Sequence, residues 1–502
     1  MSSFINNEKS NATILLSILL ISTLKAIIFK RFYPDLDFTS DTAFYVSAAI
    51  KNSSCGIWPI GYAKFLWLFH QFSSSETALF VVQYALLEFS VILFYFSCLY
   101  LFRTTRYFKW GFFLFMMVNP LFLFISNYVI ADALFTSLTI IWVTTLIWMI
   151  DNHKNALYIL QGLILSILFT IRYNAVFYPI VMIAAILPGK LNLYKKAISI
   201  LIPVLLITAF INFTQSQTYK QTGKSVFAVF GGWQLLNNAM YMLQYNNTDT
   251  INTPREFRQI NLLTFNYIDS LQKAQTYLSP KNGSVFMWHT DGPLKQLMRS
   301  SRNNPSDTSN PFKTWAIMTK QYQRYGQYLI KKYPLDFLHH YVFENALIYF
   351  FPSPEVLQTY LRPGTDMNTV NNELSSLFGN VRTTIKSPDT KLQGDIMSFF
   401  PWIIIAAHLI LIVQIFWIYP KVEKRTKFTY LFSVFLLTNF LFSIFASPIV
   451  LRYQIPMIII VIAFTLMLAD EITIHHTRII TNITDDFESP NSVQKRVLMV
   501  RN

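Results

Sequence analysis

The chain has 502 residues, of which 53% are hydrophobic, 17% aromatic and only 13% charged. A soluble domain carries roughly 25% charged residues, so this composition excludes an ordinary soluble protein and places most of the chain in lipid. Two cysteines in this length exclude a disulfide framework. The formal net charge of +15 could serve to bind nucleic acid or to set the orientation of the chain in a membrane. The positions of the basic residues decide between these two explanations.

Ten apolar runs reach or approach the length of about 20 residues that a helix needs to cross a bilayer. We expect the first run to be an uncleaved span, because no small-residue cleavage pattern follows it. The run 174–188 is short, and we expect it to be tilted or broken. The predicted spans are 12–30, 77–102, 107–126, 131–150, 156–171, 174–188, 196–213, 399–419, 427–447 and 450–469.

The basic residues follow every second predicted span, whereas the short turns on the other side carry almost none. By the positive-inside rule, the basic side is cytoplasmic and both termini lie there. The basic surplus is therefore topological, and we expect no nucleic-acid partner. The residues that define the basic side are Arg103, Arg106, Lys109, Lys154, Lys190, Lys195, Lys196, Lys421, Lys424, Arg425 and Lys427.

This orientation places two polar segments outside, the first outer loop 31–76 and the long segment 214–398. The aromatic stretch 58–69 is too short to span and should lie in the membrane interface. The run 334–351 is interpreted as an interfacial or re-entrant helix, because a crossing there would move the basic turn after the eighth span outside. The predicted fold is an all-α polytopic membrane protein of about ten spans, with an N-terminal seven-span module (1–213), an extracytoplasmic loop domain (214–398), a three-span module (399–469) and a weakly structured cytoplasmic tail (470–502).

Carboxylates mark the outer side of this arrangement. Asp41 has two open interpretations, either a helix-start residue that suits the helix dipole or a general base for an acceptor hydroxyl. Asp132, in the next outer turn, is either a helix cap or a second acid on the same rim. Asp35 and Asp37 have the Asp-x-Asp spacing that can hold a divalent cation such as Mg or Mn, although such pairs also arise by chance.

Two arginines lie in other short outer turns, each followed by a tyrosine. Arg172 and Arg452 either extend to lipid headgroups or use the guanidinium fork to bind a phosphate at the membrane surface. His339, His340 and Glu344 have a spacing that can share one helical face and bind metal, and packing at an aromatic interface is the alternative.

The layout resembles that of the GT-C glycosyltransferases, integral-membrane enzymes that use polyprenyl-phosphate-linked sugars. The resemblance rests on Ser40-Asp41-Thr42-x-x-Tyr45 ahead of Trp58-Pro59-Ile60-Gly61-Tyr62, on an acid in the second outer turn, and on a large outer loop after the seventh span. It continues weakly at Arg452-Tyr453-x-x-Pro456. The sequence departs from the family at Thr42, where many relatives carry a second acid.

The resemblance implies a bacterial inner-membrane enzyme that moves a sugar from a polyprenyl-phosphate donor to a glycan, lipid or protein acceptor on the extracytoplasmic side. It implies that Asp41 and Asp132 are the catalytic acids. A polysaccharide flippase or transporter is the alternative from another class, and an O-antigen polymerase or ligase is the alternative within enzymes. The residues expected to contact substrate are Tyr45, Arg172, Tyr173, Arg452 and Tyr453.

The charge pattern makes a topological prediction. Single cysteines at Gly283 and Lys424, in a chain whose Cys55 and Cys98 are replaced, should react with an impermeant thiol reagent from opposite sides of the membrane. Gly283 should be labelled from outside and Lys424 only after permeabilisation. Labelling of both positions from the same side would contradict the ten-span arrangement.

Overall fold

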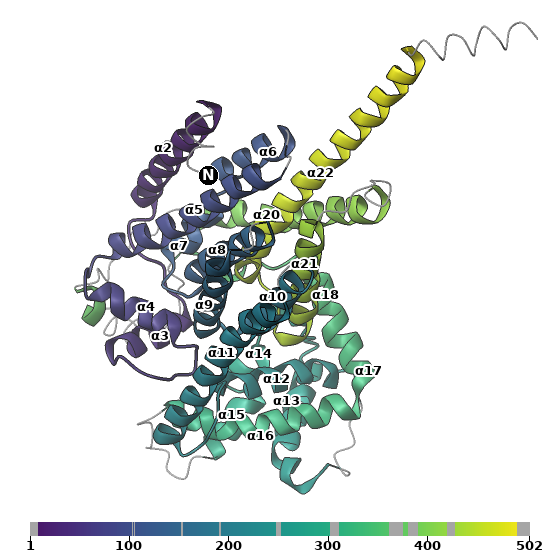
Figure 1. Ribbon diagram of the computed structural model, residues 1–502. Coiled ribbons are helices and arrows are strands. Elements are labelled where there is room, and N and C mark those ends of the chain that lie inside the picture. Colours follow the sequence, from purple (N-terminus) through teal and green to yellow (C-terminus); the bar gives the residue numbers. More distant parts are fainter. Residues whose placement is uncertain are drawn as a thin grey trace, which may run out of the picture.

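The computed structural model describes residues 9–102, 104, 106–151, 154–189, 192–246, 253–301, 311–360, 375–379, 390–418 and 427–488. Within these ranges the chain is helical (Figure 1), with two isolated β-bridges and no strand. The predicted all-α class is therefore confirmed for the described part of the chain. The basic turn that contains Lys421, Lys424 and Arg425 lies outside the described residues, as do Arg103 and Lys190.

Seven described helices are long and apolar enough to cross a membrane, so the chain is a multi-pass membrane protein. Seven of the predicted spans fall on these helices. They are α2 (Lys9–Phe32), α5 (Glu76–Leu101), α8 (Asp132–Asp151), α11 (Leu193–Thr222), α20 (Thr390–Val413), α21 (Lys427–Ala446) and α22 (Leu451–Glu488).

The other three predicted spans are broken or short. The run 107–126 forms α6 (Arg106–Val118) and α7 (Leu121–Asn127), which meet at 44°. Pro120 lacks the N–H that a continuous helix needs, and the Asn119 side chain accepts a hydrogen bond from Leu121 N at the bend. The remaining two runs form α9 (Asn155–Ile171) and the pair η1 (Tyr173–Phe177) and α10 (Tyr178–Ile186), which are shorter than full spans. The number of ten spans stays a prediction.

The expectation of a weakly structured tail from Asp470 onward is wrong for residues 470–488, because α22 continues to Glu488. No glycine or proline interrupts the sequence between Asp470 and Pro490, so nothing in it stops the helix. Asp470 is also buried, and its carboxylate accepts hydrogen bonds from the Tyr107 and Phe108 amides at the start of α6. This contact fixes α22 to the N-terminal helices.

A buried ion pair joins two of the membrane helices. Lys25 Nζ on α2 lies 3.9 Å from a Glu88 carboxylate oxygen on α5, and both side chains are largely buried. Lys25 also donates a hydrogen bond to Met116 O on α6, at 2.8 Å. Because a lone charge in lipid is costly, these contacts tie the three helices together.

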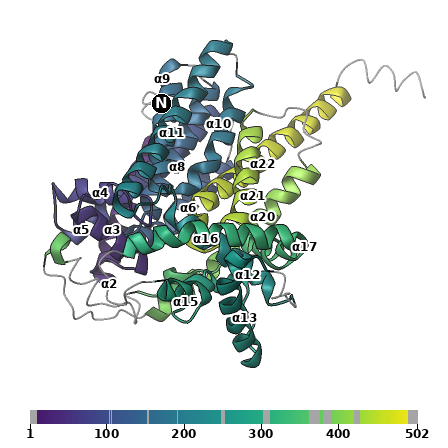
Figure 2. The same cartoon turned by 90° about the horizontal axis from the view of Figure 1, so that it is seen from below.

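The segment between α11 and α20 builds a second hydrophobic core. Its buried centre contains Trp233, Trp315, Tyr322 and Tyr325, and it is continuous with Ile444 and Ile449 near the end of α21. In Figures 1 and 2 its helices gather at one end of the molecule. They are α12 (Val229–Leu243), η2 (Arg255–Phe257), α13 (Arg258–Lys273), η3 (Pro280–Asn282), α14 (Val285–Trp288), α15 (Pro293–Ser300), α16 (Pro311–Lys332), α17 (Pro334–Phe337), η4 (Leu338–Phe343) and α18 (Glu344–Phe350). The run 334–351, expected to be interfacial or re-entrant, forms the last three of these helices and is not among the candidate spans.

The first outer loop folds back onto the bundle through α3 (Ser40–Ile50) and α4 (Gly61–His70). Gly61 allows this approach, because a Cβ atom there would lie only 2.5–2.8 Å from Thr170 and the Ile171 nitrogen. α4 therefore presses against the end of α9, immediately before Arg172. The loop that carries Asp41 is held next to the turn that carries this arginine.

Candidate functional site

Asp41 lies in the first turn of α3, but the helix is capped by other residues. Thr39 is the N-cap, and its hydroxyl accepts a hydrogen bond from Asp41 N at 3.2 Å. Thr42 completes the capping box by accepting from Thr39 N at 3.0 Å, and its hydroxyl donates to Val129 O. The Asp41 carboxylate is thus not the cap. Thr42, the departure from the GT-C pattern, has a structural role at the start of this helix.

Backbone pairing joins the first outer loop to the turn 127–131 that precedes α8, which is the predicted second outer turn. Asp37 N donates to Asn127 O at 2.8 Å, and Val129 N donates to Asp37 O at 3.1 Å. Gln83 on α5 adds hydrogen bonds from its amide nitrogen to Ser126 O and Tyr128 O. These contacts set the start of α8, and so of Asp132, beside the start of α3.

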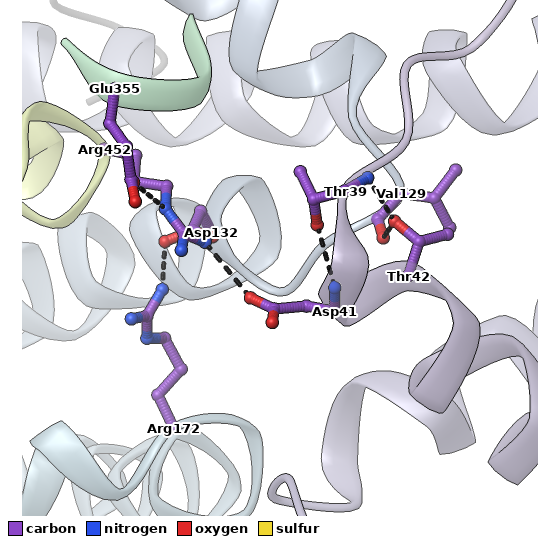
Figure 3. A network of polar contacts seen from close by, with 8 residues as sticks. All are labelled: Thr39, Asp41, Thr42, Val129, Asp132, Arg172, Glu355 and Arg452. Carbon is purple, nitrogen blue, oxygen red and sulfur yellow. Dashed lines mark hydrogen bonds and ion pairs between the residues drawn. The ribbon is translucent and has the colours of Figure 1, made fainter. Parts of the chain in front are cut away.

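The two acids meet two arginines in one group of ion pairs. Asp132, whose side chain is 3% exposed, binds Arg172 through one carboxylate oxygen and Arg452 through the other. Arg452 Nη1 lies 3.4 Å from Asp132 and 3.5 Å from Asp41 (Figure 3). Residues from α3, α8, α22 and the turn after α9 therefore converge. The sequence placed these four residues on one rim, and the structure brings them into contact.

Sequence reasoning missed a fifth member of this group, Glu355. Its carboxylate lies 3.4 Å from Arg452 Nε. It begins the short helix η5 (Glu355–Gln358), where its φ of 48° is a strained backbone conformation for a residue other than glycine. Leu451 N donates to Ser353 O at 2.8 Å, which holds this turn against the start of α22. The signal available in the sequence was a lone acid just after Pro352-Ser353-Pro354. We call Asp41, Asp132, Arg172, Glu355 and Arg452 the acid–arginine cluster.

Aromatic rings surround the cluster. The guanidinium carbons of Arg172 and Arg452 lie 4.4 Å and 4.7 Å from the centre of the Tyr453 ring, so one ring contacts both cations. Tyr45 is buried and packs edge-on against Tyr62 at 5.0 Å. Burial raises the pKa of Tyr45 well above its usual range, so its hydroxyl stays protonated and able to donate a hydrogen bond.

All members of the acid–arginine cluster line one cavity of about 840 Å³. Tyr45, Tyr173 and Tyr453 line it too, so the structure brings every residue expected to be catalytic or to contact substrate to a single space. Its other walls come from the second hydrophobic core and from the end of α21. The cavity therefore lies between the N-terminal helices and the segment that follows α11.

The charge balance of the cluster acts on Asp41. Three carboxylates face two guanidinium groups, so full ionisation leaves one net negative charge. Burial raises the pKa of Asp41 above its usual range, Arg452 opposes this rise, and the neighbouring Asp132 and Glu355 add to it. Asp41 is consequently suited to take up a proton more readily than an ordinary aspartate.

Asp35 and Asp37 do not belong to this cavity. Asp37 is buried, its backbone pairs with the second outer turn, and one carboxylate oxygen accepts from Phe38 N at 2.8 Å. His340 stacks on Tyr245 at 3.8 Å, as expected for a packing residue. Across the described ranges, no three His, Cys, Asp or Glu side chains gather as a metal would require. The His339, His340 and Glu344 set therefore does not gather as a three-ligand metal site, whereas a cation bound by the Asp35 and Asp37 pair stays a prediction.

The cluster makes a prediction about stability. Asp132→Asn should lower the free energy of unfolding by about 3–5 kcal/mol, because it leaves Arg172 and Arg452 without their shared buried partner. Asp41→Asn is the matched control and should cost much less, since Asp41 is 19% exposed and Thr39 keeps the helix cap. Thermal unfolding in detergent measures both variants. Equal midpoint temperatures of unfolding for Asp132→Asn and Asp41→Asn would contradict this account of Asp132.

Comparisons with protein-family models, curated proteins and solved structures found no match to this chain. The GT-C resemblance therefore rests on the motifs and layout of the sequence.

Proposed function

We propose that this chain is an integral-membrane glycosyltransferase of the GT-C type. It would transfer a sugar from a polyprenyl-phosphate-linked donor to an acceptor on the extracytoplasmic side of a bacterial inner membrane. The observation that carries the proposal is the meeting of Asp41, Asp132, Arg172 and Arg452 at one cavity. Acids paired with arginines in a cavity next to membrane helices suit the attack of a hydroxyl on a sugar whose leaving group is a lipid-linked phosphate.

Asp41 is assigned the role of general base. In the proposed step its carboxylate takes the proton of an acceptor hydroxyl while that oxygen bonds to the anomeric carbon of the sugar. The bond between the anomeric carbon and the phosphate oxygen breaks, and its electron pair leaves with the polyprenyl phosphate. Attack opposite the leaving group inverts the configuration of the sugar. Asp41 supports this role because it is more exposed than Asp132 and is not occupied as a helix cap.

Arg172 and Arg452 are assigned to the departing phosphate. Negative charge builds on the phosphate as the bond breaks, so a fixed cation stabilises the transition state more than the ground state. Asp132 holds both guanidinium groups and fixes their separation and direction. Glu355 occupies the Nε side of Arg452, so a phosphate binding there must compete with this carboxylate.

The transporter alternative has less support from the geometry. A transport path should carry its charged residues within the membrane helices, facing an open route. Among the described membrane helices, Lys25 and Glu88 form a buried ion pair, and neither residue lines the cavity. The cavity charges instead lie at helix starts and turns, which favours an enzyme acting at the membrane boundary.

The general-base role predicts the effect of Asp41→Asn on turnover. Loss of the base should reduce transfer from a defined polyprenyl-phosphate sugar by a factor of about 100 to 10,000. The amount of folded protein should be unchanged, since asparagine is tolerated at a helix start. Measurement of initial rates in nanodiscs tests this, and near-normal turnover would show that Asp41 is not catalytic.

The pH dependence gives a control for the same assay. A base acts only when ionised, so activity should fall as pH drops through the raised pKa of Asp41, above the usual value of about 3.9 for aspartate. The residual rate of Asp41→Asn should lack this acid limb. If Asp41→Asn shows the same fall in activity at low pH as the wild type, the fall is caused by the titration of another group.

The phosphate role predicts that Arg452→Lys loses much of the activity although the charge is kept. Lysine cannot reproduce the planar fork that binds a phosphate or carboxylate through two N–H groups. Arg172→Lys should act in the same direction. Unchanged donor affinity and turnover in both variants would show that these arginines do not bind the donor phosphate and serve only to pair with the buried carboxylates of the cluster.

A further inference from the structure

One side of the cavity is built from aromatic rings that the proposed chemistry does not use. Trp58 comes from the loop between α3 and α4, whereas Phe230 lies on α12 and Trp288 on α14. The Trp58 and Phe230 rings lie 4.4 Å apart, and Phe230 and Trp288 lie 6.3 Å apart. We call these three residues the aromatic wall. The wall and the acid–arginine cluster line the same cavity.

A buried layer supports the aromatic wall from behind. Trp233 and Trp315 are nearly inaccessible and stack with ring centres 3.9 Å apart, and Trp233 Nε1 donates to Trp315 O at 3.1 Å. Trp288 contacts Trp315 at 5.4 Å. Lys295 Nζ lies 4.5–5.4 Å from the centres of all three tryptophan rings, a cation–π arrangement that fixes them further. The position of Trp288 is thus set by packing, yet 40% of its side chain stays exposed.

Polar groups accompany the wall. Lys320 and Gln323 on α16 and Gln215 on α11 line the same cavity. The indole nitrogen of Trp58 is buried and has no hydrogen-bond partner among the residues that the structure describes. Because this nitrogen is inaccessible, the polar groups that a ligand in the cavity can reach are those of Lys320, Gln323 and Gln215.

We propose that the aromatic wall binds a saccharide acceptor by stacking of its sugar rings. This inference rests on the proposed function and names the acceptor class that the sequence left open. A pyranose presents an apolar C–H face, which packs on an indole ring, and hydroxyl groups at its edge, which pair with amides and ammonium groups. A lipid chain would leave the Lys320, Gln323 and Gln215 side chains unpaired. A peptide would bring backbone groups that need a row of partners, which three aromatic side chains do not supply.

Binding of soluble probes tests the proposal in the full-length protein. The probes are maltotetraose, mannotetraose and chitotetraose, with a hexapeptide of Gly, Asn, Ser and Thr as the comparison, each titrated by calorimetry into protein in nanodiscs. At least one tetrasaccharide should bind and the hexapeptide should not. Trp288→Ala should weaken that binding roughly tenfold or more, whereas Trp288→Phe, which keeps a ring, should restore most of it.

Trp110→Ala is the matched control, because Trp110 is exposed on α6 and does not line the cavity. It should bind the tetrasaccharide as the wild type does. Absence of binding by every tetrasaccharide, preference for the hexapeptide, or equal loss in Trp288→Phe and Trp288→Ala would overturn the saccharide proposal. Undecaprenyl phosphate titrated into the wild type separates the two claims. Binding of undecaprenyl phosphate without binding of any tetrasaccharide refutes the acceptor proposal alone. Binding of a tetrasaccharide without binding of undecaprenyl phosphate refutes the donor assignment.

Discussion

The site depends on the buried guanidinium of Arg452. It lies within 3.5 Å of carboxylates from three other parts of the chain, those of Asp41, Asp132 and Glu355. A buried cation is stable only while its partners remain in place, so the first outer loop, the second outer turn and the turn after α18 are all bound to the start of α22. Charge pairing, rather than one continuous core, sets the geometry of the cavity.

Two hydrophobic cores meet at this cavity, and each contributes a different chemistry. The N-terminal helices bring Asp132 and Arg172, whose turns are fixed by hydrogen bonds of the adjacent backbone. The second core brings rigid aromatic rings that rest on a stacked pair of tryptophans. A ligand large enough to touch both sides would be held between them, with its ring faces on one side and its charged or reacting atoms on the other.

Sequence reasoning reached the fold class and much of the cluster for identifiable reasons. Apolar length predicts membrane helices directly, and the alternation of basic turns placed Asp41, Asp132, Arg172 and Arg452 on one face of the membrane. It did not find Glu355, because that acid is brought in by a turn 97 residues before Arg452 in sequence, through a backbone hydrogen bond that no local pattern encodes. The sequence also left undecided which residue caps α3. Thr39 and Asp41 both suit a helix start, and only the three-dimensional contacts decide between them. The end of α22 was placed too early because hydropathy marks where a helix leaves lipid and not where it stops.

The ion pair between Lys25 and Glu88 has a consequence for how the chain is made. Each charge is expensive in the bilayer by itself, at roughly 2.5–3.5 kcal/mol for a basic or acidic residue at a helix centre on the insertion scale. The cost of Lys25 in the first helix is therefore offset only after the next long helix has been synthesised and can supply Glu88. Integration of the N-terminal helices is thereby coupled, and a chain stopped between the two should retain its first helix in the insertion machinery for longer than hydrophobicity alone would require.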